Sequence, residues 1–113
     1  MLAHNRRAGT QLVEKIMREG RSVHSPSLVL KYIKVGDGAP GRISVVASKK
    51  VDGRAVRRNR ARRRVYAVLS KHKDSIPAGI AGVILTKKEV LIVNHQNLEQ
   101  DALAVLKKSA SFN

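Results

Sequence analysis

The most chemically distinctive part of this 113-residue chain is a run of basic side chains between residues 49 and 64. The run contains nine Lys or Arg residues and one acid, Asp52, so it carries +8 of the formal net charge of +15. Most of these cations are arginines, whose planar guanidinium groups match a phosphate better than the point charge of lysine does. The composition therefore indicates a polyanionic partner, because so much positive charge opposes compaction of an isolated chain.

A helix over about Ala55 to Lys71 would display these cations in order. At 100° per residue, four apolar side chains form a stripe that can pack on a sheet: Ala61, Val65, Val68 and Leu69. Like-charge pairs at i,i+4, such as Arg58/Arg62, each weaken the helix by about 0.2–0.5 kcal/mol. No Asp or Glu between Gly53 and His72 relieves them, although a solvated helix face normally mixes charges. The pattern therefore favours a folded phosphate-binding surface over a solvated face or a disordered basic arm.

The N-terminal half of the chain predicts one helix and two strands. Thr10 can cap a helix that runs to about Arg18. Strands are expected over 23–35 and 43–48, and the glycine-rich turn between them should join them as a hairpin. Pro26 cannot donate a ladder hydrogen bond, so it belongs at a strand start, an edge or a bulge.

The C-terminal half completes a small α+β domain with the element order α-β-β-α-β(-β)-α. A strand over 83–86 could pair with 90–93, and Asn94 or Asn97 could cap the last helix. We expect a single RNA-binding domain over 1–113, with short flexible ends at about 1–8 and 109–113.

Several functional classes are disfavoured by what the sequence lacks. It contains no cysteine, which excludes disulfide scaffolds and cysteine-ligated metal sites. The four histidines show no zinc-binding spacing, and the eight acids form no pair suited to a two-metal nuclease, so we expect neither catalytic nor metal-binding residues here. No signal peptide or apolar run of about 20 residues is visible. A cytoplasmic location without a membrane partner is therefore expected.

RNA is a better candidate partner than duplex DNA. The sequence has no helix-turn-helix spacing, zinc finger or heptad-bearing dimer region. The basic surface would span a helix and the strand end Ser48-Lys49-Lys50, which suits a protein that reads the shape and backbone of structured RNA.

Three segments carry a resemblance to a known family. Ser48-Lys49-Lys50-Val51, Gly53-Arg54-Ala55-Val56 and Arg58-Asn59-Arg60-Ala61-Arg62-Arg63 resemble the signature of the bacterial ribonuclease P protein component. That signature reads Arg-Asn-Arg, any residue, Lys/Arg-Arg, after a Ser-Lys-Lys strand end. The resemblance extends from about Leu12 to Leu106 and includes segments 20–25 and 76–79. Its tail differs, because Tyr66 and Ala67 stand where the family has an arginine and an acidic or amide residue.

The resemblance implies a subunit of a ribonucleoprotein that removes the 5′ leader from precursor tRNA. In that family the RNA subunit carries the hydrolytic chemistry with bound Mg²⁺, and one protein joins one RNA subunit and helps to hold the leader. The residues that this resemblance implies should face the RNA subunit are Lys49, Lys50, Arg58, Asn59, Arg60, Arg62 and Arg63. We expect Ser48, Arg54, Arg57 and Arg64 to belong to the same RNA-binding surface. Asn59 could orient a side chain or a phosphate, or be a surface bystander.

The family's leader-binding cleft lies between the first helix and the sheet and typically offers aromatic side chains. The corresponding positions here are Val13, Met17 and Lys31, while Tyr32 falls on the opposite strand face. Lys31 could supply a phosphate contact, whereas Val13 and Met17 could equally be core residues. Base–aromatic stacking is worth about 1–3 kcal/mol per base, so its loss would weaken the hold on a leader nucleotide.

The family also implies a left-handed β-α-β crossover around the basic helix, in the ribosomal protein S5 domain 2-like fold class. General chain chirality favours the right-handed form, so this expectation comes from the resemblance alone. Two other functions stay open: a nuclease with its own active site, and a ribosomal or other structural RNA-binding protein without a catalytic RNA partner.

Overall fold

The computed structural model describes residues 7–36, 38–48 and 52–111. Three helices and four strands make up an α+β domain, the fold class that the sequence predicts. The predicted element order is wrong, because the single strand expected over 23–35 is two strands, so three strands precede the second helix and one follows it. In chain order the elements are α1 (Thr10–Glu19), β1 (Arg21–His24), β2 (Leu28–Lys34), β3 (Arg42–Val46), α2 (Ala55–Lys71), the 3₁₀ turn η2 (Lys73–Ser75), β4 (Ile80–Thr86), the 3₁₀ turn η3 (Lys88–Leu91) and α3 (His95–Ser111).

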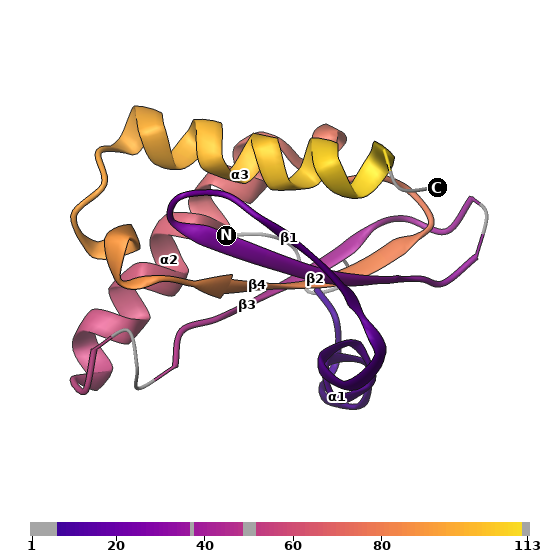
Figure 1. Ribbon diagram of the computed structural model, residues 1–113, viewed down its shortest axis with the longest axis horizontal. Helices are drawn as coiled ribbons and strands as arrows, with labels where there is room; N and C mark the ends of the chain where they lie inside the picture. Colours follow the sequence, from indigo (N-terminus) through magenta and orange to yellow (C-terminus); the bar gives the residue numbers. More distant parts are fainter. Residues whose placement is uncertain (1–6, 37, 49–51, 112–113) are drawn as a thin grey trace.

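The four strands form one mixed sheet in the order β1-β2-β4-β3. β2 is antiparallel to both β1 and β4, whereas β3 and β4 are parallel and connected through α2. Helices α2 and α3 lie over one side of the sheet and α1 lies over the other (Figure 1). β4 holds a central position because its residues are apolar on both faces, and all but Leu85 are buried.

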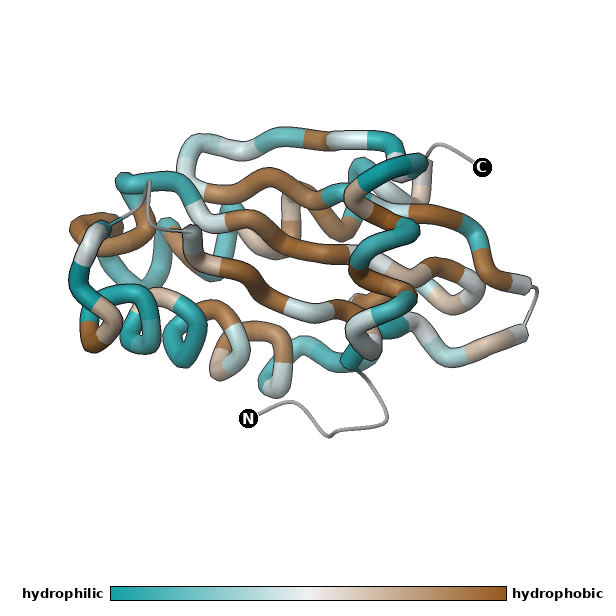
Figure 2. Tube along the Cα trace, turned by 90° about the horizontal axis from the view of Figure 1, so that it is seen from below, coloured by the Kyte–Doolittle hydropathy of each residue, from teal (hydrophilic) through white to brown (hydrophobic). Residues whose placement is uncertain are grey.

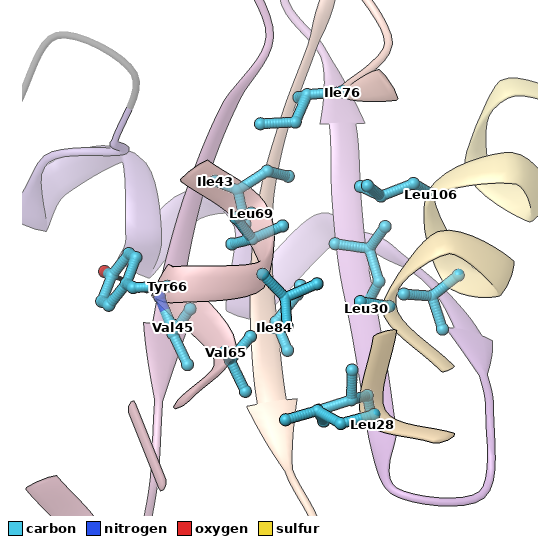
Figure 3. Packing of buried hydrophobic residues seen from close by; sticks show 14 of the residues in the cluster. Leu28, Leu30, Ile43, Val45, Val65, Tyr66, Leu69, Ile76, Ile84 and Leu106 are labelled. Atoms are coloured by element: carbon cyan, nitrogen blue, oxygen red, sulfur yellow. Dashed lines mark hydrogen bonds between the residues drawn. The ribbon is translucent and has the colours of Figure 1, made fainter. Parts of the chain in front are cut away.

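The larger core fills the space between the sheet and the two long helices. Leu28 and Leu30 of β2, Ile43 of β3 and Ile84 of β4 meet side chains of α2 and α3 there, and Figure 3 shows this packing. The helix residues include Val65 and Leu69 from α2 and Leu98 and Leu106 from α3, all fully buried. The stripe predicted on the basic helix is therefore confirmed, because Ala61, Val65, Val68 and Leu69 are all buried.

A smaller core lies under α1 on the opposite face. Ile16 is fully buried against Ala81 and Val83 of β4, and Leu12, Val13 and Ile33 pack around them. One helix covers this face, where two cover the other. In Figure 2 the strands β2, β3 and β4 are hydrophobic along most of their length, whereas the edge strand β1 is mostly hydrophilic.

The predicted hairpin between strands 23–35 and 43–48 is wrong. The hairpin instead joins β1 to β2 through Ser25-Pro26-Ser27, and β3 lies at the far edge of the sheet, next to β4. Alternation of apolar and polar residues indicates a strand but does not specify its neighbour. β4, buried on both faces, takes the place beside β2 that the prediction gave to β3.

The optional strand over 90–93 is also wrong. Residues 88–91 form η3, with Val90 N donating to Lys87 O at 3.1 Å and Ile92 N to Glu89 O at 3.1 Å. Val90 enters the large core while Ile92 is 86% exposed, so this short segment has a single buried anchor.

The end of the chain also departs from the predicted boundaries. Residues 109–111, expected in a flexible end, belong to α3, and Ser109 is fully buried. Of the two predicted caps for this helix, Asn94 is the one used, since its Oδ1 accepts from Asn97 N at 2.8 Å.

Candidate nucleic-acid interface

The single acid of the basic run organises the start of α2. Asp52 Oδ1 accepts a hydrogen bond from Arg54 N at 2.8 Å, which closes a local turn. Its Oδ2 lies 3.5 Å from Arg57 Nη1. The half-buried Arg58 donates from Nη1 to the carbonyls of Asp52 at 3.1 Å and Gly53 at 2.9 Å. These bonds fix the loop that leads into the helix.

Basic side chains at the start and on the outer side of α2, together with Asn59, give this part of the protein a positively charged surface. We call this the α2 basic surface, made of Arg54, Arg57, Asn59, Arg60, Arg62 and Arg63; all but the half-buried Arg62 are exposed. Asn59 Oδ1 accepts a hydrogen bond from Arg62 Nη2. Asn59 therefore orients a neighbouring arginine, one of the two roles that the sequence left open for it.

Arg64 is expected to face RNA with the other arginines, and the structure shows that its guanidinium also binds within the protein. Its Nη1 donates to Val90 O at 2.5 Å and its Nη2 to Val93 O at 2.6 Å. The forked guanidinium thus joins α2 to η3 and to the chain that leads into α3. Helical periodicity located this side chain at the edge of the buried stripe, but the carbonyls that it binds come from a distant segment.

The remaining positions of the family signature, Ser48, Lys49 and Lys50, follow β3 in the sequence. Ser48 is exposed two residues beyond the end of that strand. Lys49 and Lys50, both predicted to bind RNA, lie outside the described residues.

The three predicted cleft residues come together where α1 crosses the sheet. Val13 packs against the Ile16 cluster and Met17 is 39% exposed. Lys31 Nζ donates to Met17 O at 3.4 Å and so connects β2 to α1. Tyr32 points to the opposite face, as expected, and is 3% exposed. Val13 therefore serves the small core, while Met17 and Lys31 lie at its open side.

Sequence reasoning missed a groove beside α2. Its wall is Tyr66, which is 8% exposed and whose hydroxyl accepts a hydrogen bond from Val45 N at 3.0 Å. The guanidinium carbon of Arg7 lies 5.7 Å from the centre of the Tyr66 ring. The groove measures about 530 Å³ and is lined by Arg7, Val56, Asn59, Arg62, Arg63 and Tyr66. Tyr66 was noticeable in the sequence as a departure from the family signature, but nothing there linked it to Arg7.

The acids of α3 are held in contacts within the protein. Glu99 lies 3.0 Å from His72 Nε2 and 3.5 Å from Lys71 Nζ. The hydrogen bond from His72 lowers the pKa of Glu99; desolvation opposes this effect, and the charge of Lys71 adds to it. Asp101 Oδ2 accepts from Ser27 N at 3.2 Å and from Ser27 Oγ at 2.5 Å. Within residues 7–36, 38–48 and 52–111, no group of three His, Asp or Glu side chains has an arrangement that could hold a metal ion.

Comparison with protein families identifies relatives of this chain. Residues 4–110 match the family model described as Ribonuclease P. The ribonuclease P protein component of Nitratiruptor sp. is 37% identical over 93 residues, which cover 82% of this chain and 81% of that protein. The corresponding protein of Brevibacillus brevis is 29% identical over 85% of this chain and 75% of its own length.

Solved structures agree with the sequence comparisons. The ribonuclease P protein of Thermotoga maritima superposes with a TM-score of 0.74 at 27% identity and covers 84% of this chain and 88% of that one. The fold is also that of the Staphylococcus aureus RNase P protein, with a TM-score of 0.78 at 22% identity, covering 98% of this chain and all of the other. These relatives favour the ribonuclease P resemblance over the ribosomal alternative. In the described part of the chain, no helix has the length and apolar character needed to cross a membrane.

Proposed function

The chain belongs to the ribonuclease P protein family, and on that premise we propose that it binds a catalytic RNA subunit through the α2 basic surface and assists removal of the 5′ leader from precursor tRNA. One protein joins one RNA subunit, and the complex acts in the cytoplasm, where precursor tRNA is made. The RNA subunit supplies the hydrolytic chemistry, and this chain supplies binding and positioning.

The α2 basic surface is the observation that carries this proposal. Its arginines lie on α2 or, for Arg54, directly before it, and the opposite side of this helix is buried in the large core. Preorganised guanidinium groups lose little conformational freedom when they bind phosphates, which favours ordered contacts over diffuse attraction. Arg58 supports this surface by fixing the loop before α2, and Arg64 supports it from the η3 side.

Mg²⁺ is assigned to the RNA subunit and the substrate. The residues described here do not offer Mg²⁺ a set of carboxylate ligands: Asp52, Glu99 and Asp101 are each held in contacts with their own neighbours. No step of the proposed function therefore passes through a metal ion bound by this chain.

The leader would lie along the open side of the small core. Lys31 reaches the end of α1 there and places its ammonium group beside the exposed Met17. We expect Lys31→Ala to impair binding of leader-bearing precursor more than binding of mature tRNA. An equal loss for both substrates would remove Lys31 from the leader path.

Reconstitution tests the proposal as a whole. Purified protein is combined with a bacterial ribonuclease P RNA at low Mg²⁺, and leader removal from precursor tRNA is compared with and without the protein. We expect cleavage to need the RNA and to be stimulated by the protein. Cleavage by the protein alone would contradict the assignment of the chemistry to RNA, and absence of stimulation would contradict the role of subunit.

A further inference from the structure

The groove beside α2 does not stop at that helix. A second groove of about 570 Å³ adjoins it and shares Arg7 and Tyr66 as lining residues, with Arg42 and Ser44 of β3 on its far side. The two hollows therefore meet at the pair Arg7–Tyr66. This pair connects the α2 basic surface with the chain just before α1.

Tyr66 is held firmly enough to act as a platform. The Tyr66 hydroxyl accepts the hydrogen bond from Val45 N. The Tyr66 side chain lies at the β3 side of the large core, beside Val45 (Figure 3). Arg7 lies over the ring at a distance suited to a cation–π interaction. The ring therefore restrains a long side chain that would otherwise sample many rotamers.

The chemistry of the lining matches a nucleotide. The groove presents three arginines and no acid, and Asn59 holds one of them, Arg62, by a hydrogen bond. Val56, an apolar side chain that is 69% exposed, also lines the groove. Guanidinium groups bind phosphate oxygens through their N–H edges, and their planes also stack on bases. Cationic and apolar groups thus occur side by side within one hollow.

We propose that this groove binds one nucleotide of a single-stranded RNA segment, with its phosphate on Arg62 and Arg63 and its base against Arg7 and Val56. Tyr66 acts as the positioning residue, through Arg7. A base within a duplex is stacked on its neighbours, so only an unpaired nucleotide can turn its base into such a groove. The inference rests on the proposed function only in taking RNA as the partner.

Binding of short oligonucleotides tests the site without the RNA subunit. The probe is a fluorescent single-stranded oligoadenylate of about ten nucleotides, within the usual site sizes for such proteins. We expect Arg7→Ala to weaken binding about fivefold but to change the salt slope less than the loss of a phosphate contact does, because Arg7 contacts the base. Arg63→Ala should lower the slope by about 0.7, as for one lost phosphate contact to a single strand. Arg7→Lys should restore only part of the affinity, because lysine keeps the charge but lacks the planar group. Tyr66→Phe, which keeps the ring and removes the bond to Val45, should weaken binding less than Arg7→Ala.

Matched controls separate this site from general charge effects. Arg21→Ala removes the same charge from β1, at the opposite edge of the sheet from β3, and should leave affinity within about twofold. An oligonucleotide of the same length with abasic sugars should bind the wild-type protein more weakly than oligoadenylate and should lose this difference in Arg7→Ala. Equal effects of Arg7→Ala and Arg21→Ala, or equal affinity for a duplex of the same length, would overturn the proposal.

The result of the oligonucleotide-binding test does not depend on the result of the reconstitution test. If oligoadenylate binding depends on Arg7 but the protein fails to stimulate a ribonuclease P RNA, the nucleotide site stands and the proposed function fails. If the protein stimulates cleavage while Arg7→Ala binds both oligonucleotides like wild type, the proposed function stands and the site is rejected.

Discussion

Helices α2 and α3 are both 17 residues long and pack on the same face of the sheet, yet they use charge in opposite ways. In α3 the acids bind partners from other segments, and Asn94 caps the first turn. α2 begins after Arg54 with no side-chain cap and no acid in its first turn. It carries arginines there instead, although the positive end of the helix dipole disfavours cations. The acids of α3 therefore serve the fold, whereas α2 carries like charges at i,i+4 spacing that weaken the helix.

The arginines of α2 also differ among themselves in what they contact. Arg58 and Arg64 donate to backbone carbonyls of the protein, while Arg60 and Arg63 extend into solvent. Identical residue types on one helix thus have different roles, decided by whether an acceptor lies within reach. This division allows stability and RNA affinity to be changed separately.

The largest expected effect is on stability, from Arg64→Ala. Loss of the two hydrogen bonds to Val90 and Val93 should lower the free energy of unfolding by about 2 kcal/mol, measured by urea titration followed by circular dichroism. The neighbouring Arg63→Ala, at an exposed position, should change it by about 0.5 kcal/mol or less. Equal stability of the two variants would show that Arg64 does not hold α2 to η3.

A similar test applies to α3 through Asp101→Ala. This change removes the acceptor for both Ser27 N and Ser27 Oγ and should cost about 1–2 kcal/mol of unfolding free energy. Ser27→Ala removes one of the two bonds, so the double variant should be less destabilised than the sum of the single ones. Strict additivity in this cycle would mean that the pair is not coupled.

On the binding side, Arg60→Ala and Arg63→Ala should each weaken affinity for a bacterial ribonuclease P RNA by about threefold to tenfold, or about 1 kcal/mol. Each should lower the slope of log affinity against log salt by about one unit or less, because one phosphate contact is lost. Filter binding over a range of salt concentrations measures both quantities. Unchanged affinity and slope in both variants would break the assignment of the α2 basic surface to RNA.

The smallest effect concerns Glu99, which lies near Lys71 of α2 and the imidazole of His72. Its pKa is lowered in the folded protein, so its contribution to stability is present above the ordinary value of 4.5 and is lost as pH falls through the lower folded value. Glu99→Gln should therefore have a slightly lower Tm than wild type near neutral pH, and the difference should disappear in acid. A difference that persists or grows in acid would contradict this linkage.

Local patterns were sufficient to locate the helices. The cap predicted at Thr10 is wrong, because Thr10 is already the first residue of α1 and the N-cap is Gly9, which has no side chain to accept a hydrogen bond. Residues 55–71 were predicted as a helix with the correct buried stripe, because burial of Ala61, Val65, Val68 and Leu69 follows the helical repeat. The α2 basic surface followed from the same periodicity. The pairing of the strands could not be predicted in this way, because the sequence of residues 42–46 does not indicate whether β2 or β4 will lie beside them.

The amino-acid sequence by itself determined a small basic α+β domain and the family to which it belongs, since composition, helical period and motif spacing are properties of neighbouring residues. Only the tertiary structure decided that Arg64 binds η3 and that Arg7 lies over Tyr66. The Arg64 and Arg7 contacts join residues separated by long stretches of chain. Which donor finds which acceptor is then set by the packing of helices on the sheet.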